Sequence, residues 1–380
     1  MHKITKIYLV CNIFLQILQF EIMENKNTDT SRFFKWWKVA IPIVLGLGVV
    51  LYFVLKDFNQ IDFSLFKFTK YTLLFLILAF VMLVFRDFGY VLRIRVLSGG
   101  ELSWMQSLKI VLLWEFGSAI TPSAVGGTAI ATIFLWKEGM SVGKSSAIVL
   151  ATSFLDELYF SLMFPLILLI VGKSQIFVGE QNVFLEKLFW FAIAGYCLKL
   201  AWTILIGYSL FVSPKFISNF LKKIFRIRFL KKWRASAEKV ADDYVLANKE
   251  FKNKSFVFWI KSFFATFISW TARYLVLNAL FIALAVGNYT LSFYDHILIF
   301  ARQLIMWIIM LVMPSPGGSG FVEGVFSSLM SDFVGIAGFA IIMALVWRLF
   351  TYYPYLIIGA VLAPHWLSKK FKRTKKEAVS

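Results

Sequence analysis

Residues 121–127 read Thr-Pro-Ser-Ala-Val-Gly-Gly and interrupt a long apolar region. A second break, Met-Pro-Ser-Pro-Gly-Gly-Ser-Gly, occupies residues 313–320. Proline cannot donate a helical hydrogen bond and glycine tolerates turn conformations, so each break is expected to end a helix. Irregular backbone at membrane depth occurs only where it is buried in protein or lines a polar cavity. The two breaks therefore predict interrupted helices around an interior cavity.

The composition excludes a soluble globular protein. Of the 380 residues, 59% are hydrophobic and only 16% are charged, whereas soluble domains have about 45–50% and about 25%. The net charge of +19 favours cytoplasmic loops held against anionic lipid over nucleic-acid binding, so no nucleic-acid partner is expected. Two cysteines and three histidines are too few for a disulfide framework or a typical metal site, so no cofactor is expected.

The surrounding sequence consists of apolar runs separated by charged or Gly/Pro residues. They fall at 37–56, 71–97, 104–120, 124–136, 143–171, 185–212, 255–287, 292–313, 321–333 and 336–362. The runs at 124–136 and 321–333 have 13 residues each, and at about 1.5 Å per residue they cover only about 20 Å of a core roughly 30 Å thick. The fold class predicted is an all-α polytopic membrane protein.

Basic residues predict the topology. The loop 214–254 carries 12 Lys and Arg against 4 Asp and Glu, and the tail 367–380 carries 6 against 1. Both are therefore expected on the cytoplasmic side. An even number of crossings between them results if 104–136 and 292–333 form re-entrant hairpins that enter from opposite faces. This inverted repeat of spans would place a substrate site near the midplane.

Three segments complete the domain organisation. Residues 1–36 form a cytoplasmic N-terminal segment, of which 1–22 either belong to the native chain or precede a start at Met23. Residues 37–366 form the membrane domain, with 214–254 as a basic cytoplasmic loop. Apolar residues recur at helical spacing in that loop, which predicts an amphipathic helix on anionic inner-leaflet lipids. They are Ile217, Phe220, Leu221 and Ile224.

Charged residues within the apolar runs are candidate functional groups, because each costs about 2.5–3.5 kcal/mol to insert. They are Arg86, Asp87, Glu115, Asp156, Glu157, Arg273, Arg302, Glu323 and Arg348. One interpretation is a set of mutual ion pairs, with Arg86 bound to Asp156 or Glu157 and Arg348 bound to Glu323. The other is that four separated arginines beside two helix breaks receive an anionic ligand.

The helices that begin after the breaks favour the anionic ligand, because unpaired N–H groups and the helix dipole suit a phosphate. The backbone positions in this hypothesis are Pro122, Gly126, Gly127, Thr128, Pro316, Gly317, Gly318 and Gly320. The alternative is that the glycines only permit a tight hairpin, with Gly320-x-x-x-Gly324 as a helix-packing face.

The runs FGSAITPSAVGGTAIATIFLWKEG and MPSPGGSGFVEG, with Asp156 and Arg348 after them, resemble the transmembrane part of the lysylphosphatidylglycerol synthetase family, also called the flippase-like domain family. The resemblance covers roughly residues 37–365. It implies a membrane domain similar to a flippase for aminoacylated or glycosylated lipids. Thr128 and Ala129 depart from the charged residue that usually follows the family's first glycine pair.

The resemblance implies that the Pro and Gly positions of both breaks, with Glu323, act as re-entrant motif positions flanked by Asp156 and Arg348. The aminoacyl-transferase domain of multidomain members is absent from this sequence, so a separate transferase is an expected partner. We expect a bacterial inner-membrane protein that binds and moves a phospholipid or polyprenyl-linked lipid. The alternatives are a membrane-embedded glycosyl or aminoacyl lipid transferase, and a non-transporting accessory subunit of envelope lipid synthesis.

Overall fold

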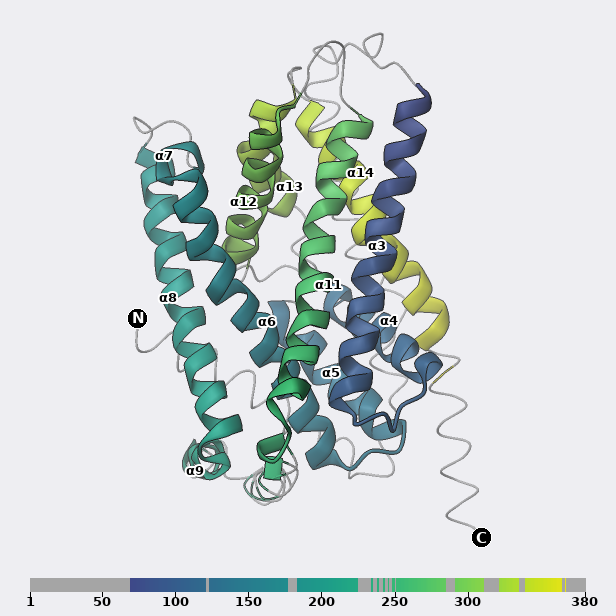
Figure 1. The fold of residues 1–380 in the computed structure, drawn as a ribbon, viewed down its shortest axis with the longest axis vertical. Helices are drawn as coiled ribbons and strands as arrows, with labels where there is room; N and C mark the ends of the chain where they lie inside the picture. The colour runs from purple at the N-terminus through teal and green to yellow at the C-terminus, as the bar shows by residue number, and fades with distance from the viewer. Residues whose placement is uncertain are drawn as a thin grey trace.

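A computed structural model describes residues 69–120, 123–176, 183–224, 251–284, 291–310, 321–334 and 339–363, with isolated positions between 234 and 249 and Trp366. These residues form helices and connecting turns without a strand, which confirms the predicted all-α class (Figure 1). The helices are α3 Lys70–Leu97, α4 Trp104–Ile120, α5 Ser123–Lys137, α6 Val142–Val171, α7 Lys173–Ile176, α8 Val183–Phe211, α9 Pro214–Ile224, α11 Phe256–Ala283, α12 Phe293–Met310, α13 Phe321–Met330 and α14 Phe339–Thr351.

Five helical segments in the described part of the chain are long and apolar enough to cross a membrane. They are Lys70–Leu97, Val142–Val171, Ala192–Phe211, Phe256–Ala283 and Ile342–Ala363. Each lies within or close to an apolar run predicted to span. The expected segment 1–36, the expected span 37–56 and the tail 367–380 lie outside the described residues.

The two pairs of shorter helices lie toward opposite ends of the bundle. In Figure 1, α4 and α5 occupy the lower half and α12 and α13 the upper half. The helices α4, α5, α12 and α13 have 17, 15, 18 and 10 residues, respectively. Each is shorter than the roughly 20 residues of a spanning helix. The re-entrant hairpins and the inverted repeat remain predictions.

Small residues allow α3 and α11 to approach closely along their length. Ser262, Ala265, Thr266 and Ser269 recur at helical spacing on α11 and are buried. Ala265 and Ser269 face Gly89 of α3, where an added Cβ would overlap the Ser269 hydroxyl and lie 2.7 Å from the Ala265 carbonyl oxygen. Helices in membranes associate through such small-residue faces because hydrophobic burial provides little drive within lipid.

A proline inside α6, near its C-terminal end, is accommodated by a neighbouring helix. Pro165 has no N–H, so it cannot donate to the carbonyl of Ser161 one turn earlier. The Tyr196 hydroxyl of α8 donates to that carbonyl at 3.2 Å instead. The Tyr196 hydroxyl thus replaces the missing N–H donor and satisfies the backbone oxygen at a depth where lipid offers no hydrogen bond. The same hydrogen bond joins α6 to α8.

The predicted helix of the basic loop is present as α9, at Pro214–Ile224. The side chains of its four apolar residues lie outside the described set. Phe216 packs edge-on against Tyr208 of α8. The Asn248 amide donates to the carbonyl oxygens of Ser209 and Leu210 at 3.1 and 3.2 Å. The loop is therefore attached to the end of α8.

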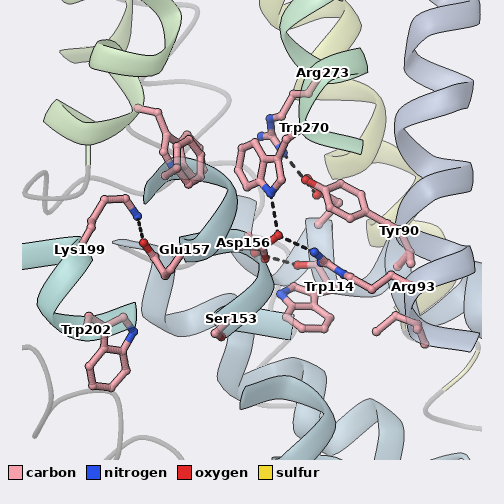
Figure 2. A pocket seen from close by; sticks show the side chains of 16 residues that line it. Tyr90, Arg93, Trp114, Ser153, Asp156, Glu157, Lys199, Trp202, Trp270 and Arg273 are labelled. Atoms are coloured by element: carbon pink, nitrogen blue, oxygen red, sulfur yellow. Dashed lines mark hydrogen bonds and ion pairs between the residues drawn. The ribbon is translucent and has the colours of Figure 1, made fainter. Parts of the chain in front are cut away.

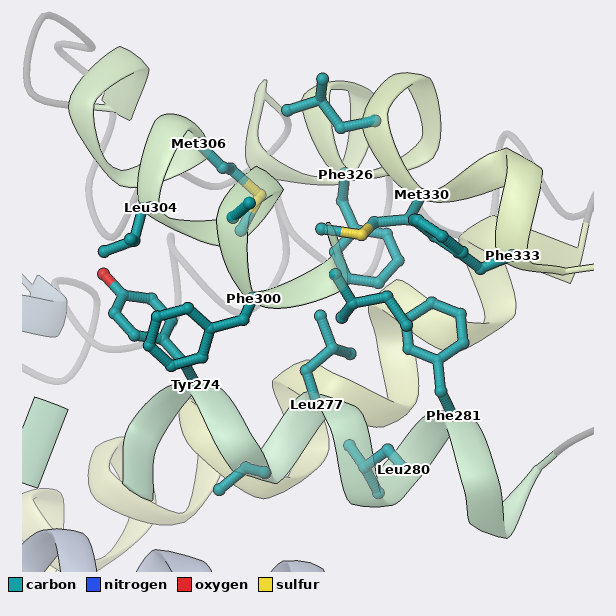
Figure 3. Packing of buried hydrophobic residues seen from close by; sticks show 14 of the residues in the cluster. Tyr274, Leu277, Leu280, Phe281, Phe300, Leu304, Met306, Phe326, Met330 and Phe333 are labelled. Carbon is teal, nitrogen blue, oxygen red and sulfur yellow. The ribbon is translucent and has the colours of Figure 1, made fainter. Parts of the chain in front are cut away.

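Buried apolar residues form two clusters rather than one core. The first gathers the upper parts of α6 and α11 with α12, α13 and α14, and includes Leu277, Phe281 and Phe326 (Figure 3). The second gathers the lower end of α3 with α4, α5 and the start of α6, and includes Ile94, Phe116 and Phe134. The boundary between the clusters is where the candidate site lies.

Candidate functional site

A cavity of about 180 Å³ opens among α3, α4, α6, α8, α11 and α12, near the middle of α6, α8 and α11 (Figure 2). Its walls combine six aromatic rings with equal numbers of cationic and carboxylate side chains. The lining residues are Tyr90, Arg93, Ile94, Val111, Trp114, Glu115, Ser118, Ser153, Asp156, Glu157, Phe160, Lys199, Trp202, Trp270, Arg273 and Trp307.

Asp156 connects α6 to α3 and α11. Its Oδ1 lies 2.5 Å from Arg93 Nη1 and accepts a hydrogen bond from Trp270 Nε1 at 2.6 Å. Arg93 also donates to the Thr266 hydroxyl at 3.3 Å. Since the carboxylate has two donors from two different helices, its position and negative charge are well supported.

Glu157 points to the other side of α6, because consecutive residues on a helix are about 100° apart. Its Oε2 lies 2.5 Å from Lys199 Nζ of α8, as the left part of Figure 2 shows. The Lys199 side chain is only 5% exposed, and its ammonium lies 4.8 Å from the ring centroid of Phe160. This pair is the charged link between α6 and α8.

Glu115 of α4 lies between two arginines. Arg86 Nη2 approaches its Oε1 to 2.5 Å and Arg273 Nη1 approaches it to 3.6 Å. Arg86 is fully buried behind the cavity wall and also lies 3.7 Å from Asp87. The predicted pairing of Arg86 with Asp156 or Glu157 is therefore wrong. The rotation of α3 directs Arg86 toward α4, whereas Arg93, two turns later, reaches α6.

Arg273 is the cation with the weakest ionic contact in the cavity wall. Its side chain is 23% exposed, and its ion pair among the described residues is the 3.6 Å approach of Nη1 to Glu115 Oε1. The guanidinium lies over the rings of Trp270 and Trp307, at 5.2 and 5.3 Å from their centroids. Aromatic faces stabilise a cation without neutralising it, so Arg273 can accept an additional anionic partner.

Two predicted arginines lie elsewhere. Arg302 of α12 donates to the Leu329 and Gln175 carbonyl oxygens at 2.7 and 3.1 Å and lies 3.0 Å from Asp332, so it fastens the connections at one end of the bundle. Arg348 of α14 is buried with its guanidinium 4.6 Å from the ring centroid of Tyr352. Neither residue lines the cavity.

The glycine-rich breaks are described only in part. Pro122, Pro316, Gly317, Gly318 and Gly320 lie outside the described residues, and the surroundings of Gly126 and the side chains of Thr128 and Glu323 are likewise not described. Their proposed role, and the pairing of Arg348 with Glu323, stay predictions.

Two glycines near the breaks differ in their surroundings. Gly127 is buried, and an added Cβ would overlap the hydroxyl of Ser118, which lines the cavity. This glycine therefore permits α5 to approach α4. A Cβ on Gly324 meets nothing within 4 Å among the described residues, so close packing of another described helix does not require a glycine there.

Several cavity residues were not among those predicted from the sequence. Arg93 lies near the end of its run and resembles an interfacial arginine, whereas Lys199 lies near the centre of the run 185–212. A lysine at that depth is costly in lipid and could have been identified on that ground. The cavity tryptophans carry no such signal, since the chain contains 13 and tryptophan is common at membrane interfaces.

The chain matches the family described as the lysylphosphatidylglycerol synthase transmembrane region over residues 39–359. It is similar to a UPF0104 membrane protein of Archaeoglobus fulgidus, with 28% identity over 341 residues. The matched region covers 87% of this chain and 97% of that protein. No solved structure matches the chain at a significant level.

Proposed function

Since this chain belongs to the lysylphosphatidylglycerol synthase transmembrane-region family, we propose that its cavity binds the anionic headgroup of a lipid and that the protein moves this lipid between membrane leaflets. The substrate is a phospholipid or a polyprenyl-linked lipid, and the membrane is the bacterial inner membrane. The protein itself is a multi-pass membrane protein with at least the five segments described above.

The observation that carries this proposal is Arg273. A charge in the middle of a spanning helix is costly unless it has a partner or a polar surrounding. Arg273 is at the centre of α11 and faces the cavity. Its nearest carboxylate oxygen among the described residues, Glu115 Oε1, is 3.6 Å away, which makes a weak ion pair. A phosphate oxygen placed beside it would form a charge-assisted hydrogen bond next to the rings of Trp270 and Trp307.

The size of the cavity supports a headgroup rather than a whole lipid. Pockets that enclose a drug-sized molecule have volumes of roughly 300–1,000 Å³, whereas this one has about 180 Å³. A phosphate with a small substituent would fill such a space, and the acyl chains would remain in the surrounding bilayer. Ser118 and Ser153 add hydroxyl groups to the wall. Each donates to the carbonyl oxygen one turn earlier, at 3.0 and 3.1 Å, and its oxygen can still accept a hydrogen bond from a headgroup hydroxyl or ammonium.

Reconstitution tests this proposal. The full chain is placed in liposomes that contain a trace of fluorescent phosphatidylglycerol, and the outer-leaflet label is quenched with dithionite. We expect dithionite to quench nearly all of the fluorescence in liposomes that contain the wild-type protein. In protein-free liposomes, about half of the fluorescence should remain, because the inner-leaflet label is protected. Arg273→Ala should lower the exchange rate at least tenfold, the effect of losing about 1.4 kcal/mol of headgroup interaction.

Arg234→Ala is the matched control, because Arg234 is an exposed arginine paired with Glu238 at 2.9 Å outside the cavity. This variant should exchange lipid at the wild-type rate. Formation of a modified lipid when aminoacyl or glycosyl donors are added would instead favour the transferase. If neither lipid exchange nor a modified lipid is detected, the accessory-subunit alternative is favoured. Either of these two results would contradict the proposed flippase.

A further inference from the structure

The three cavity carboxylates differ in how many donors hold them. Glu115 has two arginines, and Asp156 has Arg93 together with the indole N–H of Trp270. Glu157 has one donor, the Lys199 ammonium, among the described residues. Glu157 is therefore the carboxylate whose charge depends on a single partner.

An anion that enters the cavity competes for that partner. Lys199 and Glu157 both line the cavity, and an ammonium has three N–H donors that can turn toward a phosphate. Once the single positive charge of Lys199 also balances the ligand, the buried Glu157 carboxylate no longer has a cation of its own. Such a group is strongly destabilised and regains stability by taking up a proton.

The other charged and titratable groups around the cavity do not replace Lys199. They come from α3, α4, α6 and α11, and α12 contributes only Trp307. They are Tyr90, Arg93, Glu115, Asp156 and Arg273. Arg93 is bound to Asp156 at 2.5 Å, and Arg273 is the residue expected to contact the phosphate. The neighbouring Asp156 adds a negative charge that further disfavours an unpaired Glu157 carboxylate.

We propose that binding of an anionic headgroup in the cavity is coupled to uptake of one proton by Glu157. This inference rests on the proposed function. The proton comes from solvent and bonds to a Glu157 carboxylate oxygen, while Lys199 stays protonated and pairs with a phosphate oxygen. The anion and the proton enter together, so the net charge of the cavity does not change. A proton gradient across the membrane would then bias the direction of lipid movement.

Calorimetric titration tests the coupling. The full chain in nonionic detergent micelles is titrated with dihexanoyl-phosphatidylglycerol, in pairs of buffers that differ in ionisation enthalpy. The dependence of the heat on the buffer gives the number of protons bound per lipid. For the wild type we expect about one proton, and a dissociation constant that rises about tenfold for each unit of pH above neutrality.

Glu157→Gln should still bind the lipid, because glutamine resembles the protonated acid, but without proton uptake and with an affinity independent of pH. Glu101→Gln is the matched control, since Glu101 is an exposed partner of Lys144 outside the cavity. It should retain the wild-type proton uptake and pH dependence. An infrared difference spectrum of the wild type gives a second measurement, in which lipid should produce the band of a protonated carboxyl group.

The outcomes separate the coupling from the proposed function. Lipid binding by the wild type without proton uptake would overturn the coupling and leave headgroup binding intact. Uptake that persists in Glu157→Gln would assign the proton to another group and would also overturn it. Absence of lipid binding by the wild type at any pH would refute headgroup binding and the coupling together.

Discussion

The contact between α3 and α11 at Gly89 should be intolerant of a single methyl group. Replacing Gly89 by Ala improves helix propensity by about 1 kcal/mol. The new Cβ, however, would overlap the Ser269 hydroxyl and lie 2.7 Å from the Ala265 carbonyl oxygen and 3.1 Å from the Ser269 nitrogen. Two of these atoms belong to the backbone, so a rotamer change cannot relieve the overlap and the helices must separate.

Overpacking of this kind costs about 1–3 kcal/mol, and separation would loosen the whole small-residue face. Because two of the three close contacts are with backbone atoms, we expect a cost in the upper part of that range, about 2–3 kcal/mol. After the propensity gain of about 1 kcal/mol is subtracted, Gly89→Ala should lower the free energy of unfolding by about 1–2 kcal/mol. SDS-induced unfolding in mixed micelles, followed by far-UV circular dichroism, measures this change. Gly324→Ala is the control, because its Cβ meets nothing within 4 Å among the described residues, and it should gain about 0.5–1 kcal/mol.

Equal or greater stability of Gly89→Ala would refute the reasoning, since it would mean that α3 and α11 are not held at this distance. Adding Ser269→Ala to Gly89→Ala should recover only part of the loss. The hydroxyl overlap disappears in that double variant, whereas the contact with the Ala265 carbonyl oxygen remains.

Two further predictions concern charge and topology. Arg86→Met should lower the free energy of unfolding by about 3–5 kcal/mol, because Glu115 loses its 2.5 Å partner. Arg86→Met with Glu115→Leu should recover only part of this loss, because Asp87 and Arg273 lose their contacts at 3.7 and 3.6 Å. A double variant whose loss equals the sum of the single losses would show that the pair is not coupled. Single cysteines at Gln181 and Lys375 should be labelled from opposite faces of the membrane, the first from outside and the second from the cytoplasm. Labelling of both from one face would overturn the inverted-repeat topology.

The helices follow from the sequence more closely than the site does. The predicted run 104–120 coincides with α4, and 143–171 differs from α6 by one residue. Such agreement is expected because lipid requires unbroken apolar segments with internally satisfied backbone groups. Composition and breaks determine these ends without knowledge of how the helices pack.

The partners of the charged residues depend on helix rotation, which hydrophobicity does not determine when a helix is apolar on all sides. Asp156, Glu157 and Arg273 were predicted and do line the cavity. Arg86 pairs with Glu115 instead of the α6 carboxylates, because about 100° of rotation per residue decides which neighbour a side chain meets. Lys199 could have been identified from the sequence alone, because it lies near the centre of the apolar run 185–212.

The replacement of a missing helix bond by the Tyr196 hydroxyl makes two distant positions genetically dependent on one another. The hydroxyl has its role at the Ser161 carbonyl only while residue 165 is proline. A relative with alanine at the position of Pro165 regains the backbone N–H and should tolerate phenylalanine at the position of Tyr196. In a lineage that keeps the proline, loss of the hydroxyl should be selected against, so substitutions at the two positions are expected to arise in a fixed order.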